Sequence, residues 1–327
     1  KAGHANRALE VLAPVVETVV FDDVEENPTT SDVARGVEFA RGRRVEAIVA
    51  LGGGSAMDCA KGINFLLTNG GQMEDYWGFG KATKPMLPSI AVPTTAGTGS
   101  EAQSYALISQ DETNAKMACG DHKARFRTIV LDPTLMATLE GAAAAVSGID
   151  AVSHAVESFV TRTRNPVSTL FSKEAWNLLD DSFEPIVRGT ADDRTRGRML
   201  IGSFLAGAAI EHSMLGAAHA CANPLTASRG VVHGHAVGLM LPHVVRFNAV
   251  EVGEQYEELH PGGAGTLITR VAELQNIGRL PVRLRDLDVP RDGLPIFATA
   301  AAEQWTAQHN PRAVTAKELL DLYEAAY

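Results

Sequence analysis

The sequence predicts an α/β domain followed by an all-helical domain, and two observations support this division. Short apolar runs alternate with helical stretches up to about residue 137, as in parallel βαβ units. From about Pro133 onward the pattern changes to helical periodicity in alanine-rich segments. The chain is long enough for two hydrophobic cores, and we therefore expect domains at residues 1–137 and 138–327.

The first half contains four predicted strands and three predicted helices. The predicted strands are Val16–Phe21, Ala47–Leu51, Ser89–Val92 and Thr128–Leu131. The predicted helices are Ala5–Leu12, Val33–Arg41 and Ser55–Leu67, with Ser31 or Asp32 as the expected cap of the second. Nucleotide-binding α/β domains usually open with a strand, whereas this chain opens with a helix. The usual N-terminal strand region is therefore expected to be absent.

The second half is predicted to be helical, with helices at Ala142–Val160, Phe171–Leu179 and Arg198–Ile210. A net charge of −10 and a pI near 5.5 argue against nucleic acid and anionic membranes, which require a basic surface. Three scattered cysteines fit a reducing compartment. No apolar run reaches about 18 residues and the N-terminus lacks a signal core, so a cytoplasmic protein without a membrane partner is expected.

A run of three glycines follows the second predicted strand, in the segment Gly52-Gly53-Gly54-Ser55. Glycines at such a turn let backbone N–H groups approach an anion, and the helix N-terminus adds partial positive charge. A tight turn in which Ser55 or Asp58 caps the helix is the alternative. Three consecutive glycines exceed what a cap needs, so phosphate binding is favoured.

A second glycine-rich segment, Pro93–Glu101 (PTTAGTGSE), follows the strand Ser89–Val92. Its hydroxyls and glycines suit hydrogen bonds to phosphate and ribose. Residues 97–102 match the dinucleotide fingerprint G-x-G-x-x-A, although Pro93 interrupts the strand and such matches arise by chance. Two glycine-rich turns in one domain are stronger evidence for a nucleotide site than either turn alone.

The helix predicted at Ala142–Val160 contains Asp150 and His154, which lie on one face, one turn apart. By itself this pair favours an Asp–His hydrogen bond or ion pair over a metal site. A metal site becomes the favoured interpretation when the rest of the chain is considered, because five of the ten histidines lie between His212 and His243.

With His219 and His233, fourteen residues apart, the pair Asp150 and His154 would form a ligand set of one oxygen and three nitrogens. Such a set suits Fe²⁺ or Zn²⁺ and leaves a position for a substrate oxygen. On spacing alone, further candidates are His212, His235 and His243. The remaining histidines are expected at surface or capping positions: His4, His122, His260 and His309.

Four motifs occur in a specific order. They are Gly53-Gly54-Ser55-x-x-Asp58-x-x-Lys61, Pro93–Glu101, Gly148-Ile149-Asp150-Ala151-x-x-His154-Ala155-x-Glu157, and His233-Gly234-x-Ala236-x-x-x-x-Leu241-Pro242-x-x-x-x-x-Asn248. Together they closely resemble the iron-containing (group III) alcohol dehydrogenases, from about Asn27 to the C-terminus. The resemblance implies a Rossmann-like N-terminal domain and an all-α C-terminal domain, the dehydroquinate synthase-like architecture.

The resemblance also implies a site. The implied ligands of Fe²⁺ or Zn²⁺ are Asp150, His154, His219 and His233. The implied contacts to NAD or NADP come from Asn27, Gly53, Gly54, Ser55, Asp58, Thr94, Thr95, Thr98 and Lys116. The implied reaction is reversible hydride transfer between a small alcohol or aldehyde and nicotinamide, in a homodimer or larger homo-oligomer.

Two departures from the family pattern stand out. Relatives usually begin earlier, and the missing segment would hold the acidic residue that separates NAD from NADP users. Many relatives also have a histidine near the nicotinamide where this chain has Asn223, which cannot titrate. We therefore expect proton transfer through His235, through water, or not at all.

Two other functions were weighed. A dehydroquinate-synthase-like lyase would need a strongly basic pocket, and no Arg/Lys cluster lies near Asp150 or His219 in the sequence. A non-catalytic metal-binding relative is suggested by the absent N-terminal strand, but the complete ligand set argues against it.

Overall fold

The computed structural model describes residues 2–113 and 115–327, which form two compact units. The first unit contains the chain up to Thr95 together with Ser100–Thr138. The second contains Ala96–Gly99 and Leu139–Tyr327. The four residues Ala96–Gly99 therefore belong with the second unit, although the chain on both sides of them belongs to the first.

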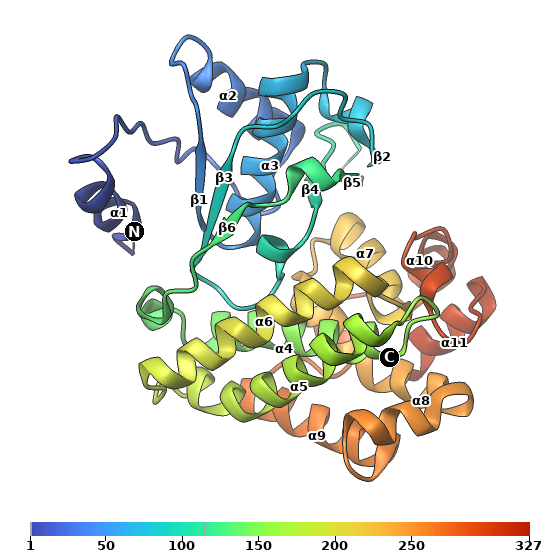
Figure 1. Ribbon diagram of the computed structural model, residues 1–327. Coiled ribbons are helices and arrows are strands. Elements are labelled where there is room, and N and C mark those ends of the chain that lie inside the picture. Colours follow the sequence, from blue (N-terminus) through green and yellow to red (C-terminus); the bar gives the residue numbers. More distant parts are fainter. Residues whose placement is uncertain (1, 114) are drawn as a thin grey trace. The chain divides into compact units, whose positions relative to one another are not determined.

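The first unit contains two three-stranded sheets (Figure 1). One sheet is parallel, in the order β1-β3-β6, and the other has the order β2-β5-β4 with β4 and β5 antiparallel. The strands are β1 (Ile48–Gly52), β2 (Gly78–Phe79), β3 (Ser89–Pro93), β4 (Tyr105–Ser109), β5 (Lys116–Gly120) and β6 (Thr128–Ile129). The helices are α1 (His4–Leu12), α2 (Thr30–Ala40) and α3 (Gly54–Asn69). The parallel sheet agrees with the predicted Rossmann-like domain, whereas the second sheet was not predicted.

Helix α3 forms the centre of the first unit because two of its faces are apolar. It contacts both β1 and β4. Met57 packs with Ala50 and Ala91 of the parallel sheet. Phe65, which is fully buried, belongs to a second core with Ile108 of β4 and with residues of α2 and β5. The turn that precedes α3 is therefore fixed by packing on both sides of the helix.

Two local predictions in the first unit were wrong. Val16–Phe21 forms no strand, because β1 pairs only with β3 and no described strand pairs with this segment. Helix α2 begins earlier than predicted and is capped by Thr29 rather than by Ser31 or Asp32. Asp32 instead completes a capping box, in which the Thr29 N–H donates to its carboxylate at 2.7 Å.

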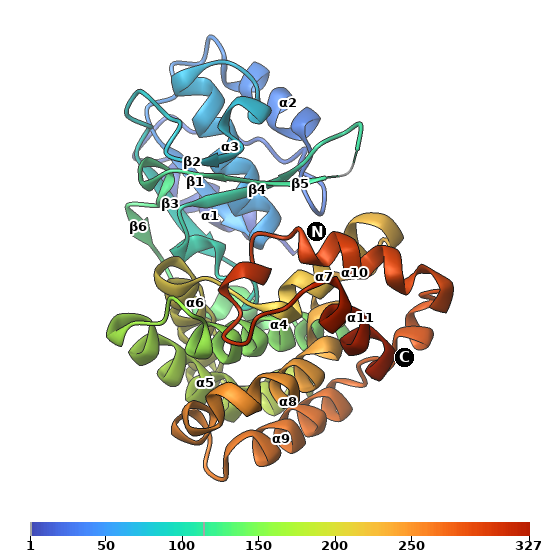
Figure 2. The same ribbon diagram turned by 90° about the vertical axis from the view of Figure 1, so that its right-hand side faces the viewer.

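The second unit is all-helical, as predicted. Its helices are α4 (Gly141–Val160), α5 (Pro166–Val187), α6 (Asp193–Ser213), α7 (Ala217–Arg229), α8 (His233–Leu259), α9 (Gly263–Gly278), α10 (Leu294–Ala302) and α11 (Ala316–Ala325). Helix α4 is the central one, in contact with α5, α6, α8 and α9, and α8 and α9 run side by side (Figure 2). Every residue of α4 from Gly148 to Val160 is buried, so any polar side chain in that stretch needs a partner.

No single helix among the described residues is both long and apolar enough to cross a membrane. The bent pair formed by α6 and α7 meets those limits only when its two helices are taken together.

Candidate metal centre and nucleotide turn

Three helices of the second unit bring the four candidate ligands together. Asp150 and His154 lie on α4, His219 on α7, and His233 at the start of α8. The Nε2 atoms of the three histidines lie 3.6, 3.7 and 3.8 Å from one oxygen, Oδ1 of Asp150. Ligand atoms of Asp150, His219 and His233 all lie within 4.8 Å of one another. These three are spaced as they would be around one small cation, whereas His154 lies outside that group and joins it only through its distance to Asp150 Oδ1.

Two of the donor atoms are buried without a protein partner. Asp150 Oδ1 and His219 Nε2 make no hydrogen bond within the part of the chain that the structure describes. A buried polar atom left in this way costs about 1–3 kcal/mol, and a bound cation would satisfy both atoms. Carboxylate oxygen and imidazole nitrogen suit Fe²⁺ and Zn²⁺. The residues therefore fit a divalent transition metal.

The Nδ1 atoms of His154 and His219 donate hydrogen bonds to acceptors of different charge. His154 Nδ1 donates to the carbonyl of Gly97 at 3.1 Å, and His219 Nδ1 donates to Glu157 Oε2 at 2.6 Å. In the neutral form of each ring, these bonds hold the proton on Nδ1 and leave the lone pair on Nε2. The two rings are thus oriented for ligation, one by a neutral group and one by a carboxylate.

The protonation of the cluster follows from these contacts. Burial lowers the pKa of His154 to about 4, so its neutral form prevails at neutral pH. Burial would also lower the pKa of His219, but the hydrogen bond to Glu157 and the negative charges of Glu157 and Asp150 raise it to about 9. Burial opposes ionisation of Asp150, yet the three histidines hold its pKa below the ordinary value. A metal ion would therefore displace a proton from His219.

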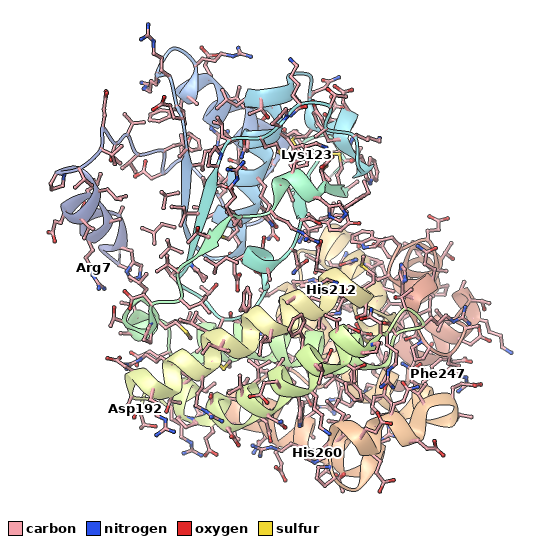
Figure 3. The ribbon with its side chains drawn as sticks, in the orientation of Figure 1. Arg7, Lys123, Asp192, His212, Phe247 and His260 are labelled. Atoms are coloured by element: carbon pink, nitrogen blue, oxygen red, sulfur yellow. The ribbon has the colours of Figure 1, made fainter. Side chains whose placement is uncertain are left out.

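Other histidines of the second unit make different contacts. The ring of His212 packs against Phe171 and that of His260 against Trp176, with centroid distances of 6.1 and 5.4 Å (His212 and His260 are labelled in Figure 3). His243 is part-buried, and its Nδ1 makes no hydrogen bond to any described residue. None of these three belongs to the group of closely spaced ligand atoms found among the described residues.

The two candidates for proton transfer lie differently with respect to the ligands: His235 is turned away from His233, whereas Asn223 shares a helix face with His219. His235 follows His233 by two positions on α8, which turns its side chain by about 200° around the helix. Burial lowers the pKa of His235. Asn223 lies one turn beyond His219 on α7, and its Nδ2 donates to Gln304 Oε1 at 3.0 Å. The contact with Gln304 was not anticipated from the sequence.

In the first unit, the turn between β1 and α3 has the form expected of an anion site. Gly52 has φ 151°, a conformation that favours glycine. Gly53 is the N-cap residue of α3, and no side chain caps this end of the helix. The alternative in which Ser55 or Asp58 caps α3 was therefore wrong. The uncapped N–H groups of the first turn are the donors that a phosphate would use.

Residues from distant parts of the first unit meet at this turn. The N–H of Asn27 donates to Ser55 Oγ at 3.2 Å, and Lys116 Nζ donates to Asn27 Oδ1 at 3.4 Å. Asn27 has φ 57°, a backbone conformation that asparagine tolerates better than most residues. Thr95 adjoins Gly53, since a Cβ on Gly53 would lie 3.0 Å from Thr95 Oγ1. The structure thus brings Asn27, Ser55 and Lys116 together.

Asp58 and Lys61 of α3 take part in a buried cluster of hydrogen-bonded polar groups. Ser100 Oγ donates to Asp58 Oδ1 at 2.5 Å, and Lys61 Nζ donates to the Ser100 and Tyr105 carbonyls, each at 2.7 Å. Burial raises the pKa of Asp58. These bonds attach α3 to the segment that follows the second glycine-rich turn, which is a structural role for Asp58 beside the expected cofactor contact.

The second glycine-rich turn divides between the two units. The Thr94 N–H donates to the Gly52 carbonyl at 2.9 Å within the first unit. Gly97 and Gly99 belong to the second unit, where Gly97 lies against Ser147 of α4 and Gly99 against Gly207 of α6. Thr98 lies between these two packed glycines. The glycines of the fingerprint match therefore make room for helices.

One residue near the candidate metal centre was not predicted as a site residue, although it lies in the same motif as Asp150 and His154. Glu157 is buried and contacts His219 directly. Its spacing contained a usable signal, because Asp150, His154 and Glu157 recur at i, i+4 and i+7 and so occupy one face of α4.

Comparison with known proteins identifies the family. The family model described as "Iron-containing alcohol dehydrogenase" matches residues 1–133, and the model described as "Fe-containing alcohol dehydrogenase family, C-terminal" matches residues 144–327. The chain is 32% identical to the 1,3-propanediol dehydrogenase of Citrobacter freundii over 340 residues, covering 100% of this chain and 88% of that protein.

Solved structures agree with this assignment. A 1,3-propanediol oxidoreductase structure is similar with a TM-score of 0.94 and 31% identity, covering 99% of this chain and 88% of the other. The structure of sulfoacetaldehyde reductase from Bifidobacterium kashiwanohense in complex with NAD+ is similar with a TM-score of 0.89 and 26% identity, covering 99% and 87%. The chain belongs to the iron-containing alcohol dehydrogenase family and is an alcohol dehydrogenase or aldehyde reductase.

Proposed function

We propose that the chain catalyses reversible hydride transfer between a small alcohol and a nicotinamide dinucleotide, with one divalent metal ion held by Asp150, His154, His219 and His233. The observation that supports this ligand set most directly is the convergence of three imidazole Nε2 atoms on Asp150 Oδ1, an oxygen that makes no hydrogen bond to any described residue. The family assignment favours this function over the lyase alternative.

The protein groups of the site would perform two tasks. Asp150 contributes a negative charge inside an apolar helix bundle, and the Nδ1 bonds of His154 and His219 orient both rings for ligation. A metal ion held there supplies Lewis acidity to a substrate oxygen, and the nicotinamide supplies or accepts the hydride. Iron, as in the family name, or zinc both suit this donor set.

The dinucleotide is proposed to place its pyrophosphate on the turn Gly53–Ser55, at the uncapped start of α3. Asn27 and Lys116 lie beside Ser55 and are proposed to contact the same ligand. Further proposed contacts are Gly54, Asp58, Thr94, Thr95 and Thr98. The complex of the sulfoacetaldehyde reductase relative with NAD+ supports NAD as one acceptable cofactor. NAD or NADP preference is open to a direct comparison of NADH and NADPH as reductants.

For the proton, we propose exchange with solvent. His235 faces away from His233 on α8, and Asn223 cannot titrate. Neither residue therefore supports an internal relay. Introducing Asn223→His should add an inflection near pH 6.5 to the pH–rate profile, whereas His235→Ala should leave the profile unchanged. Loss of an existing inflection in His235→Ala would restore His235 as the relay.

The ligand set is tested by metal analysis of His233→Ala. Wild-type protein should bind one divalent ion per chain, and the variant should bind far less because one donor of four is gone. His243→Ala is the matched control, since His243 lies on the same helix and outside the ligand cluster. Full metal content in His233→Ala, or loss in His243→Ala, would overturn the assignment.

A panel of aldehydes with NADH and NADPH then identifies the substrate. Cytoplasmic location and a homo-oligomeric state stay predictions.

A further inference from the structure

Glu157 is a buried carboxylate that receives four hydrogen bonds at the start of one helix. Three come from backbone N–H groups, those of Gly216 at 3.2 Å, Ala218 at 2.7 Å and His219 at 3.3 Å. The fourth comes from the ring of His219 at 2.6 Å. Glu157 is 3% exposed, so water does not compete for these bonds. A single side chain of α4 thus holds both the backbone and the ring of one candidate ligand on α7.

The start of α7 explains why a carboxylate is required there. The first turn of any helix has N–H groups without partners and carries partial positive charge. The N-cap residue of α7 is Gly216, which has no side chain to cap it. A Cβ at this position would lie 2.8 Å from Asn310 Oδ1 and 3.0 Å from Glu157 Oε1. The cap is therefore supplied from other segments, and the glycine makes room for it.

Asn310 supplies the remaining part of this cap. Its Oδ1 accepts the Ala217 N–H at 3.1 Å. Asn310 and Asn248 of α8 exchange two hydrogen bonds, at 3.0 and 2.7 Å, and both side chains are buried. Asn310 thus caps the helix without touching the ring of His219. Glu157 and Asn310 share the structural task, whereas only Glu157 contacts the imidazole.

We propose that Glu157 is a positioning residue of the metal centre, which sets the affinity for the metal by orienting and polarising His219. The proposal rests on the ligand set proposed above. A carboxylate that accepts from Nδ1 makes Nε2 a stronger donor than a carbonyl would, and His154 has only a carbonyl in that place. Asp150 and Glu157 also place two negative charges in a buried site, which balance the charge of one divalent cation.

The test compares Glu157→Gln with Asn310→Ala in the full chain. Each protein is stripped of metal with a chelator and titrated with Zn²⁺ in competition with a chromophoric chelator. Glu157→Gln should weaken Zn²⁺ binding about 10- to 100-fold, the range seen when an outer partner of a metal-ligating histidine is lost. Asn310→Ala should lower the unfolding temperature yet change Zn²⁺ affinity less than about threefold, because the His219–Glu157 bond remains.

A spectroscopic measurement separates positioning from general loss of stability. With Co²⁺ in the site, Glu157→Gln should shift the visible absorption bands of the ion, whereas Asn310→Ala should leave them as in wild type. Glu157→Asp, which keeps the charge on a shorter side chain, should recover part of the Zn²⁺ affinity. Equal Zn²⁺ affinity in wild type and Glu157→Gln would overturn the proposal, as would equal losses in Glu157→Gln and Asn310→Ala. Metal binding that survives His233→Ala would instead count against the ligand set itself.

Discussion

The two glycine-rich turns look alike in the sequence, but their glycines serve different purposes. At Gly52–Gly54 the glycines form an uncapped helix start, where open N–H groups favour an anion. At Gly97 and Gly99 the absent side chains let a segment lie against α4 and α6. A glycine pattern alone therefore does not distinguish the approach of a ligand from the approach of a helix. What distinguishes them is that an added Cβ would meet only side-chain atoms at Gly52 and Gly53, but backbone atoms of α4 and α6 at Gly97 and Gly99.

The largest effect is expected from Gly99→Ala. A Cβ there would lie 2.6 Å from the Gly207 Cα and 2.9 Å from the Ser203 carbonyl oxygen, and Gly99 has φ 60°. Both neighbours are backbone atoms, which cannot rotate away. Overpacking and left-handed strain together should lower the free energy of unfolding by at least about 3 kcal/mol. Denaturant unfolding measures this loss.

The matched control for Gly99→Ala is Gly141→Ala. Gly141 has nearly the same φ, 62°, but nothing lies within 4 Å of its added Cβ. Strain alone should then lower the free energy of unfolding by about 1–2 kcal/mol. If both variants lose equal stability, the packing of Gly99 against α6 contributes nothing and the comparison between the turns breaks down.

The next effect is on nucleotide binding, through Gly53→Val. The added side chain would stand where a phosphate approaches the start of α3, so NADH or NADPH affinity should fall by at least about 100-fold. Metal content should stay at the wild-type level, because the candidate ligands lie in the other unit. Calorimetry with each nucleotide and metal analysis give the two readouts. Wild-type nucleotide affinity in this variant would move the pyrophosphate site to Gly97–Gly99.

The difference between the turns also shows what the sequence could predict. The helix start after Ala47–Leu51 and the Asp150/His154 pair follow from local periodicity and were placed correctly on β1, α3 and α4. The contact of Gly99 with Gly207 joins segments far apart in the chain, which no local pattern encodes. For the same reason Ser55 was misjudged as a possible cap, since its hydroxyl accepts from Asn27 instead.

The metal site shows the same limit. Spacing left His212, His219, His233, His235 and His243 as candidate partners for Asp150, and the resemblance to a family was needed to choose among them. The contacts that hold the ligands in place were even harder to predict. Glu157 lies in the same motif as Asp150 and His154, but its hydrogen bond to His219 depends on how α7 begins beside α4. Val16–Phe21 failed for a related reason, because strand propensity does not reveal whether a partner strand is available.

A smaller effect is expected from Gly97→Ala, which links the second turn to the metal centre. The added Cβ would lie 2.4 Å from Ser147 Oγ and 3.0 Å from the Ser147 carbonyl oxygen. The collision should lower the free energy of unfolding by about 1–3 kcal/mol. It should also weaken Zn²⁺ binding, because the displaced Gly97 carbonyl holds the ring of His154. Adding Ser147→Ala removes the hydroxyl, the nearest obstacle, and should restore part of the stability, since the Ser147 backbone stays in place; no recovery would mean that the hydroxyl is not the obstacle.

The smallest effect is on the pH dependence of stability, and it concerns Glu101. This acid follows the second turn as Asp58 follows the first. Burial raises the pKa of both acids, but Asp58 also accepts a hydrogen bond from Ser100. The pKa of Glu101 rises from an ordinary 4.5 to about 7. Between these values the folded state holds a proton that the unfolded state has released, so stability is present in full below pH 4.5 and is lost as pH rises through 7. Between pH 6 and pH 8, Glu101 should account for a loss of about 1 kcal/mol in the free energy of unfolding. Glu101→Gln should abolish that part of the pH dependence, as measured by denaturant titration at each pH.

The control is Glu112→Gln, which removes the same charge at an exposed position and should leave the pH dependence as in wild type. An unaltered pH dependence in Glu101→Gln would mean that the pKa of Glu101 is not raised in the folded protein.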